Sequence, residues 1–182
     1  DTLMTIKHEI GNSILGLIAG DITRQDTEAV VNTANKMLSP GGGVSGAIHR
    51  VAGPKLWEEC KTLGGCNTGE AKLTRGYNLK AKYVIHTVGP VYSNSINDAE
   101  DLKDCYRNSL LLASRKNIKS ISFPSISTGI FGYPVKDASM IALKTIIDFL
   151  KEHAGIELVR MVLFSKGDYN IYKSSLENIL KD

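Results

Sequence analysis

The stretch ISFPSISTGIFGYP, residues 121–134, joins two kinds of local structure and indicates how the chain is built. It opens with an apolar, strand-like run that stops at Pro124, and a helix-like segment follows Pro134. Between them lie hydroxyl side chains, two glycines and the aromatic residue Phe131. Backbone N–H groups in front of a helix form a ready site for phosphate, and an aromatic side chain beside them could cover a ring. The stretch therefore predicts a strand, a ligand-binding loop and a helix.

Strand-like and helix-like segments alternate along the rest of the chain. Short apolar runs flanked by turn residues predict strands at residues 3–9, 13–19, 29–32, 69–77, 82–90, 119–125 and 157–165. Apolar side chains at helical spacing predict helices at residues 44–62, 99–116, 135–153 and 169–181. Pro54 predicts a break in the first helix, or the start of a second one. The polar residues 93–98 are predicted to be a loop.

This alternation predicts an α/β fold in which a mixed, mostly parallel sheet lies between helices. The hairpin joined across residues 11–13 adds an antiparallel edge. The chain has 182 residues, 42% of them hydrophobic, which suits one compact domain over residues 1–182. Ligands in such folds bind beyond the carboxyl ends of the parallel strands. The loops near residues 19, 32, 124 and 164 are therefore the places to look for a site.

Composition and charge exclude several classes of protein. Charged residues make up 23% of the chain and the net charge is +3, a mildly basic balance that fits an anionic ligand. The chain lacks the Lys/Arg blocks of a nucleic-acid arm, so nucleic acid is not expected as a partner. No apolar run approaches the roughly 20 residues that span a bilayer, so no membrane partner is expected.

The cysteines and histidines do not indicate a metal site. Cys60, Cys66 and Cys105 form no CxxC pair, and the four histidines do not cluster with them at metal-ligand spacing. We therefore expect neither a metal nor a cofactor. Reduced, buried thiols predict a cytoplasmic protein. Because the sequence does not begin with methionine, it is expected to be a trimmed form or a piece of a longer protein.

Two of the four loops carry a residue that could meet a flat ring. Asp21 follows the strand that ends near residue 19. It is either the N-cap of the turn that follows or the acceptor of a hydrogen bond from an amino group on a ring. Phe164 ends the last strand, and it either belongs to the core or stacks on such a ring. The residues alone do not decide between the two roles of Asp21 or between the two roles of Phe164.

The loop after residue 32 combines asparagines with glycines. Asn32 and Asn35 come first, and asparagine side chains commonly satisfy the backbone of a turn. The run Gly41-Gly42-Gly43 then enters a helix at Val44. It is either a flexible loop or a turn that lets the backbone and the helix N-terminus approach an anion. The run matches neither a Walker A site nor the GxGxxG fingerprint of dinucleotide-binding proteins.

A second loop of small residues follows the strand of the opening stretch. It consists of Ser127, Thr128 and Gly129, and Ile130 and Phe131 come directly after it. Two separate loops of small residues predict a ligand with two adjacent phosphates, held from both sides.

Several motifs, taken in their order and spacing, resemble the macrodomain family. They are GDIT (20–23), NTAN (32–35), GGGVSGAIHRVAG (41–53), AKYVIHTVGP (81–90) and SISTGIFGYP (125–134). The resemblance covers about residues 13–181, and it is greatest to the MacroD-type subclass. It implies a three-layer α/β/α fold that binds ADP-ribose. It also implies hydrolysis of ADP-ribose from the carboxylate side chains of modified proteins, or deacetylation of O-acetyl-ADP-ribose.

The resemblance further implies roles for individual residues. Asp21 accepts a hydrogen bond from the adenine amino group, Ile22 offers its backbone N–H, and Phe164 packs on adenine. Phe131 packs on the distal ribose, and Asn35 holds the hydroxyls of that ribose and is the catalytic residue. The diphosphate lies between two sets of residues, namely Gly42, Gly43, Val44 and Ser45 on one side and Ser127, Thr128, Gly129 and Ile130 on the other.

One departure from the subclass bears on catalysis. MacroD-type hydrolases carry an aspartate at the position that Ser45 occupies here. A serine near neutral pH cannot serve as a carboxylate base, so the ligand's own phosphate would have to orient the attacking water. His49 matches a histidine of the family, or it is simply a half-buried helix residue.

Three hypotheses of different classes follow. The first is a metal-independent enzyme that removes ADP-ribose from acidic side chains or deacetylates O-acetyl-ADP-ribose, with water positioned by the phosphate and Asn35. The second is a reader module that binds ADP-ribose without cleaving it, which Ser45 favours. The third, a nucleic-acid binder, needs a basic stripe that the chain lacks.

Overall fold

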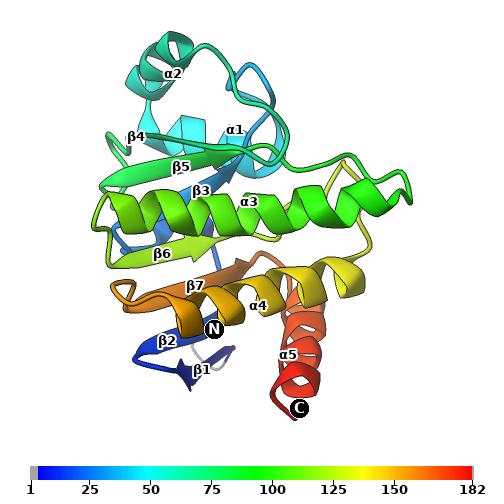
Figure 1. Ribbon diagram of the computed structural model, residues 1–182. Coiled ribbons are helices and arrows are strands. Elements are labelled where there is room, and N and C mark those ends of the chain that lie inside the picture. Colours follow the sequence, from blue (N-terminus) through cyan, green and yellow to red (C-terminus); the bar gives the residue numbers. More distant parts are fainter. Residues whose placement is uncertain (1–3, 182) are drawn as a thin grey trace.

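The computed structural model describes residues 4–181, and one mixed seven-stranded sheet forms the centre of this part of the chain (Figure 1). Along the sheet the strands follow in the order β1-β2-β7-β6-β3-β5-β4. Their bounds are Thr5–Ile10 (β1), Ser13–Ala19 (β2), Ala29–Thr33 (β3), Ala71–Arg75 (β4), Tyr83–Thr87 (β5), Ser120–Phe123 (β6) and Leu158–Leu163 (β7). Each predicted strand is present, although residue 3, where the first was predicted to begin, lies outside the described residues.

The direction of the strands follows from how they are connected. The central strands β2, β7, β6, β3 and β5 pair in parallel, whereas β1 pairs antiparallel with β2. This confirms the predicted mostly parallel sheet with an antiparallel edge. The sheet has a second antiparallel edge that was not predicted, because β4 and β5 are also antiparallel. The residues between them, 76–82, are too few for the crossover that a parallel pair requires.

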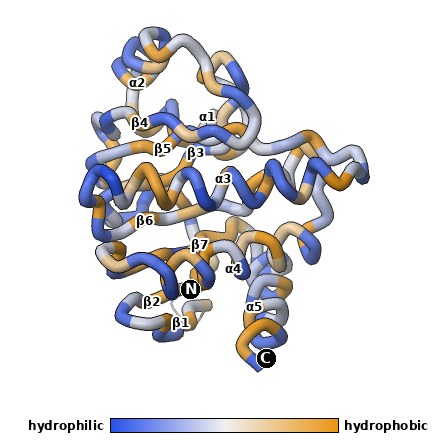
Figure 2. The backbone as a smooth tube through the Cα atoms, in the orientation of Figure 1, coloured by the Kyte–Doolittle hydropathy of each residue, from blue (hydrophilic) through white to orange (hydrophobic). Residues whose placement is uncertain are grey.

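Helices cover both faces of the sheet, which confirms the three-layer α/β/α fold. Their bounds are Gly43–Ala52 (α1), Pro54–Cys60 (α2), Ile96–Arg115 (α3), Val135–Glu152 (α4) and Lys166–Lys181 (α5). Helices α3, α4 and α5 bury their apolar sides in one core with Leu15 and Leu17 of β2, and α1 and α2 pack on the other face over Val30 and Val84. Figure 2 shows hydrophobic and hydrophilic segments alternating along α3, as expected for a helix that buries one side.

Two helix boundaries show what apolar periodicity can and cannot predict. The predicted break at Pro54 is confirmed, because α1 ends before Gly53 and Pro54 opens α2 as its first residue. The predicted loop at residues 93–98 is wrong in its second half, since α3 begins at Ile96. Ser95 caps this helix and Asp98 accepts a hydrogen bond from the Ser95 backbone N–H, a capping box made of polar side chains.

The parallel strands carry their following loops to one edge of the sheet. Gly20 N donates to Leu163 O over 2.9 Å, so the chain leaving β2 lies beside the end of β7. Ala34 N donates to Thr87 O, also over 2.9 Å, at the ends of β3 and β5. Across residues 4–181, no helix is long and apolar enough to cross a membrane.

Candidate ligand-binding cleft

A cleft of about 350 Å³ lies at the carboxyl ends of β3 and β6. Its lining residues come from the loop after β3, the start of α1 and the loop after β6, and they are Thr33, Ala34, Asn35, Gly41, Gly42, Gly43, Val44, Ser45, Ser125, Ser127, Gly129, Ile130 and Phe131. The two loops of small residues therefore meet across one cleft, as the sequence predicted. The lining also contains Thr33, Ala34, Gly41 and Ser125, which belong to the quoted motifs but to which no role was assigned from the sequence.

The glycine run forms the turn into α1. Gly43 has a φ of 54°, in the left-handed region that glycine adopts readily. Gly42 is the N-cap residue, and no side chain in the described part of the chain caps this helix. The first N–H groups of α1 are therefore left for a ligand, next to the partial positive charge of the helix N-terminus.

The turn also depends on a glycine inside α1. A Cβ atom added at Gly46 would lie 2.6 Å from the carbonyl oxygen of Gly41, closer than a carbon and an oxygen can approach. The backbone at Gly41 thus packs directly on the helix. The sequence-based prediction missed Gly46, although it belongs to the same glycine-rich motif.

Ser45 places a hydroxyl in the cleft without a protein partner. The residue is 5% exposed, and its Oγ has no hydrogen-bond partner within residues 4–181. A buried hydroxyl left unpaired costs about 1–3 kcal/mol, so a water molecule or a ligand atom is expected there. The Ser45 Oγ and the Asn35 Nδ2 lie 3.8 and 3.9 Å from the position of a Cβ added at Gly41. Both polar groups therefore flank the same part of the cleft.

Asn35 satisfies its own turn while lining the cleft. Its Oδ1 accepts from the backbone N–H groups of Met37 and Ser39, at 3.1 and 3.0 Å. Its Nδ2 donates to the carbonyl and hydroxyl oxygens of Ser39, at 3.1 and 3.0 Å. The turn-stabilising interpretation is thus correct for this structure, and a contact with a ligand would exchange one of these bonds.

The loop after β6 turns its hydroxyls into the protein. Ser127 adopts a φ of 69° and its Oγ donates to the Pro90 carbonyl oxygen over 2.8 Å. The Thr128 hydroxyl donates to the Ser125 carbonyl oxygen over 3.1 Å and lies 2.9 Å from the Ser125 Oγ. Thr128 is the one predicted member of this loop that does not line the cleft. The hydroxyls hold the loop in shape, and its backbone N–H groups remain for a ligand.

Two nonpolar side chains of this loop differ in exposure. Ile130 is 98% exposed and Phe131 is partly buried, and both line the cleft. Tyr92 N donates to Phe131 O over 2.8 Å, which ties the loop to the chain leaving β5. The predicted wall of the cleft at Phe131 is consistent with this placement.

Asp21, Ile22 and Phe164 lie outside the lining of the cleft. Asp21 is an N-cap, since its Oδ1 accepts from Thr23 N at 2.9 Å and from Thr23 Oγ1 at 2.7 Å. Its Oδ2 is 3.8 Å from Arg24 Nε, in an ion pair exposed to solvent. Ile22 is buried at 6% exposure, whereas Phe164 is 90% exposed and so is not part of the core. The ends of β2 and β7 bring Asp21 and Phe164 to neighbouring positions.

A buried polar cluster within the sheet, formed by β3, β5 and β4, was not predicted. His86 of β5 is completely buried; its Nδ1 lies 3.1 Å from Asn32 Nδ2 and its Nε2 lies 2.9 Å from Thr74 Oγ1. Asn32 donates to the ring and does not line the cleft. Burial, with a smaller contribution from His49, lowers the pKa of His86 to about 3. His86 is therefore neutral at physiological pH.

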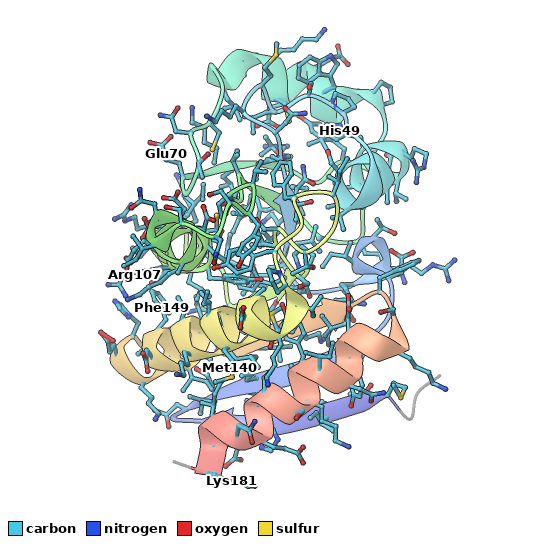
Figure 3. The ribbon with its side chains drawn as sticks, turned by 90° about the vertical axis from the view of Figure 1, so that its right-hand side faces the viewer. His49, Glu70, Arg107, Met140, Phe149 and Lys181 are labelled. Atoms are coloured by element: carbon cyan, nitrogen blue, oxygen red, sulfur yellow. The ribbon has the colours of Figure 1, made fainter. Side chains whose placement is uncertain are left out.

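His49 and the cysteines do not supply a further reactive group. Figure 3 shows His49 on α1. The residue is 8% exposed, and burial lowers its pKa. Burial also raises the pKa of Cys60 and Cys66 to about 11 and that of Cys105 to about 12, so these thiols stay protonated. Within residues 4–181, no three His, Cys, Asp or Glu side chains are grouped so that they could hold a metal ion.

The fold and the cleft define the class of the protein: a three-layer α/β/α domain with a ligand cleft at the carboxyl ends of its parallel strands. The chain matches the Macro domain family over residues 31–142, and it belongs to this family. It is 52% identical to a macro domain-containing protein of Chlorobaculum tepidum over 166 residues, which is 91% of this chain and 96% of the relative.

Other relatives are longer proteins or have been solved with ligands. The human ADP-ribose glycohydrolase MACROD2 is 50% identical over 165 residues, but this match covers 89% of the chain and only 39% of the relative. A variant of the Oceanobacillus iheyensis macrodomain with ADPR is 44% identical, with a TM-score of 0.95 and coverage of 98% and 100% of the two chains. The Trypanosoma brucei macrodomain in complex with ADP-ribose is also 44% identical, with a TM-score of 0.85 and coverage of 89% and 68%.

Replacing Gly46 by alanine should deform the turn into α1. Alanine is the better helix former, yet its Cβ would overlap the Gly41 carbonyl oxygen, so we expect a loss of about 1–3 kcal/mol in the free energy of unfolding. Gly167→Ala in α5 is the matched control, since its Cβ would meet only the Ser165 Oγ at 3.9 Å. Urea unfolding of both variants is the measurement. A Gly46→Ala variant as stable as Gly167→Ala would contradict the close packing at Gly41.

The buried neutral His86 should make the protein acid-sensitive. The unfolded histidine takes up a proton below its ordinary pKa of 6.5, whereas the folded one does so only near 3. Unfolding therefore binds a proton between these values, and stability falls as the pH falls. Between pH 7 and pH 5 we expect the parent protein to lose about 2 kcal/mol more than His86→Gln, whose side chain at position 86 cannot be protonated.

Urea unfolding of both proteins at the two pH values measures this difference, and an NMR titration of the His86 ring checks it directly. Equal losses in the two proteins, or a ring that is protonated at pH 5, would show that His86 is not held neutral by burial.

Proposed function

We propose that the cleft binds ADP-ribose. The observation that carries this proposal is the meeting of two loops across one cleft: the glycine turn at the uncapped N-terminus of α1, and the loop after β6 whose hydroxyls turn inward. Both loops leave backbone N–H groups for an anion, and the helix N-terminus adds partial positive charge. The Oceanobacillus and Trypanosoma relatives, solved with ADPR and ADP-ribose, support the same ligand.

In this proposal the diphosphate lies between the two loops and the two ends of the ligand extend from it. Adenine lies over the exposed ring of Phe164, and its amino group donates to Asp21, while Ile22 offers its backbone N–H. The distal ribose packs on Phe131 and reaches Asn35. One loop is made of Gly42, Gly43, Val44 and Ser45, and the other of Ser127, Thr128, Gly129 and Ile130.

We further propose that the protein is a hydrolase. It would release ADP-ribose from mono-ADP-ribosylated acidic side chains, deacetylate O-acetyl-ADP-ribose, or do both. The activity in the name of MACROD2, a relative at 50% identity, supports this reaction class. Modified proteins or the acetyl ester are then its partners in the cell. The cleft contributes by holding the distal ribose still and by placing a water molecule next to the reacting bond.

Ser45 decides how the water is activated. A serine hydroxyl does not act as a general base near neutral pH, so the ligand's own phosphate is proposed to orient the water. The Ser45 Oγ, which has no partner within residues 4–181, is free to form a hydrogen bond to the ligand or to this water. Asn35 would fix the distal ribose, which is why we propose it as the catalytic residue.

The second candidate is a reader that binds ADP-ribose without cleaving it. One observation favours it: the Asn35 amide is fully engaged by its own turn. Ser45, at the position where the resemblance implies an aspartate, fits the same candidate. A binding measurement does not distinguish the hydrolase from the reader, so the test has to measure turnover.

Asn35→Ala should reduce turnover far more than affinity, because contacts made mainly in the transition state behave this way. We expect a fall of at least about tenfold in rate, or roughly 1.4 kcal/mol of activation free energy, with a smaller change in the Kd for ADP-ribose. Ser45→Ala should be nearly silent if the phosphate orients the water. Ser45→Asp should raise the rate if a carboxylate helps, unless its charge repels the diphosphate.

The measurement is single-turnover release of ADP-ribose from a protein modified on glutamate, with affinity measured alongside. Asn12→Ala, in the hairpin turn at the opposite end of β2, is the matched control and should behave like the parent protein. A parent protein that binds tightly but releases nothing above buffer would favour the reader. Loss of most activity in Ser45→Ala would show that the hydroxyl takes part, and the phosphate-only account would be wrong.

A further inference from the structure

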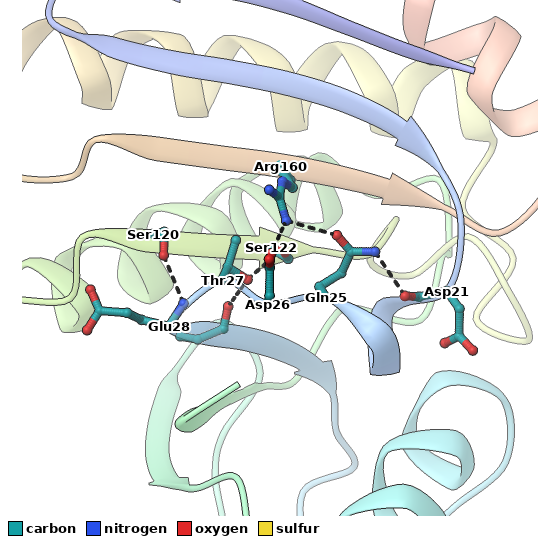
Figure 4. A network of polar contacts seen from close by, with 9 residues as sticks. Asp21, Gln25, Asp26, Thr27, Glu28, Ser120, Ser122 and Arg160 are labelled. Carbon is teal, nitrogen blue, oxygen red and sulfur yellow. Dashed lines mark hydrogen bonds and ion pairs between the residues drawn. The ribbon is translucent and has the colours of Figure 1, made fainter. Parts of the chain in front are cut away.

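A chain of side-chain contacts runs from β7 to the loop that carries Asp21 (Figure 4). Arg160 Nη1 donates to Gln25 Oε1 over 3.2 Å and to Asp26 Oδ1 over 2.8 Å. Gln25 Nε2 in turn donates to the backbone carbonyl oxygen of Asp21 over 3.1 Å. Gln25 thus links the loop that carries Asp21 to β7, an inner strand of the sheet.

The position of Arg160 in the sheet determines where this series of contacts begins. It lies within β7, between Gly16 of β2 and Ser122 of β6. A Cβ added at Gly16 would lie 3.7 Å from the Arg160 Cγ, an ordinary contact distance, so the arginine side chain passes directly over Gly16. The Arg160 side chain is only 28% exposed, whereas that of Asp26 is 76% exposed.

The chemistry of the groups fixes the orientation of the Gln25 amide. A guanidinium has only donors, so the Gln25 side chain must present its oxygen to Arg160. Its NH₂ group then faces the Asp21 carbonyl oxygen. Gln25 is 9% exposed, so little water competes for these contacts.

The same loop leaves one oxygen of the Asp21 carboxylate available. Oδ1 is held by Thr23, whereas the nearest charged group to Oδ2 is the exposed Arg24 side chain, 3.8 Å away. An ionised carboxylate is an acceptor only. It can therefore accept from the amino group of a 6-aminopurine, but it meets the carbonyl oxygen of a 6-oxopurine with repulsion. A small displacement of the Asp21 backbone would move this oxygen and weaken the discrimination.

We propose that Gln25 and Arg160 are positioning residues that set the selectivity of the site for a 6-aminopurine over a 6-oxopurine. The proposal rests on the proposed function, in which Asp21 meets the base. Arg160 orients the Gln25 amide, and Gln25 holds the Asp21 backbone where its carboxylate can accept from the amino group. Neither side chain touches the ligand.

The test compares the Kd for ADP-ribose with that for its hypoxanthine analogue, inosine diphosphate ribose, by calorimetry. We expect Gln25→Glu to lower the preference for ADP-ribose at least about fivefold relative to the parent protein. A glutamate keeps the contact with Arg160 but cannot donate to the Asp21 carbonyl oxygen. Gln25→Leu removes both contacts and should have the same effect. Because the ratio of two affinities is measured on folded protein, a uniform loss of stability does not change it.

Asp26→Ala is the matched control. It removes the ion pair from the same Arg160 nitrogen but leaves the contact with Gln25, so the ratio should stay that of the parent protein. Parental ratios in both Gln25 variants, or an equal fall in Asp26→Ala, would overturn the positioning role. A parent protein that binds neither ligand would instead refute the proposed function, and one that binds both equally would refute the role of Asp21 on which this inference rests.

Discussion

The close approach of α1 to the turn in front of it is the constraint on which the site depends. The Gly41 carbonyl oxygen lies only 2.6 Å from the place where the Cβ of any residue other than glycine at position 46 would stand. This contact needs a glycine in the helix, and Gly43 in the left-handed region completes the turn. The N-terminus of α1 is then left without a side-chain cap and faces the loop after β6. The sheet contributes by bringing the two loops, far apart in sequence, to the same edge.

Much of this arrangement could be predicted from the sequence. Alternating strands and helices gave the layers, and the rule that parallel strands end at one edge brought the glycine run and the loop at 127–131 together. The second antiparallel edge at β4 and the start of α3 at Ile96 were missed, because neither depends on apolar periodicity: one follows from a short connection, the other from the capping box of Ser95 and Asp98.

Nine of the thirteen residues predicted for the site line the cleft, whereas Asp21, Ile22, Thr128 and Phe164 do not. The sequence offered a turn-stabilising role for Asn35, which its bonds to the Met37 and Ser39 backbone match, but it did not reveal that the hydroxyls of Ser127 and Thr128 donate to backbone carbonyl oxygens. His86 was missed because a single histidine in a strand gives no pattern; only the fold shows that Asn32 and Thr74 flank its ring. Such partners are distant in sequence and are set by packing. Asp21 shows that a capping role and an available carboxylate oxygen can coexist in one residue.

The central claim, that the cleft is an ADP-ribose site, is tested most directly by calorimetric titration of the purified protein. With ADP-ribose, the account predicts one ligand bound per chain with micromolar or tighter affinity. With AMP, which lacks the second phosphate and the distal ribose, it predicts weaker binding to the same site. An absence of binding heat with ADP-ribose at millimolar concentration, or equal affinities for the two ligands, would contradict the claim that two loops clasp a diphosphate.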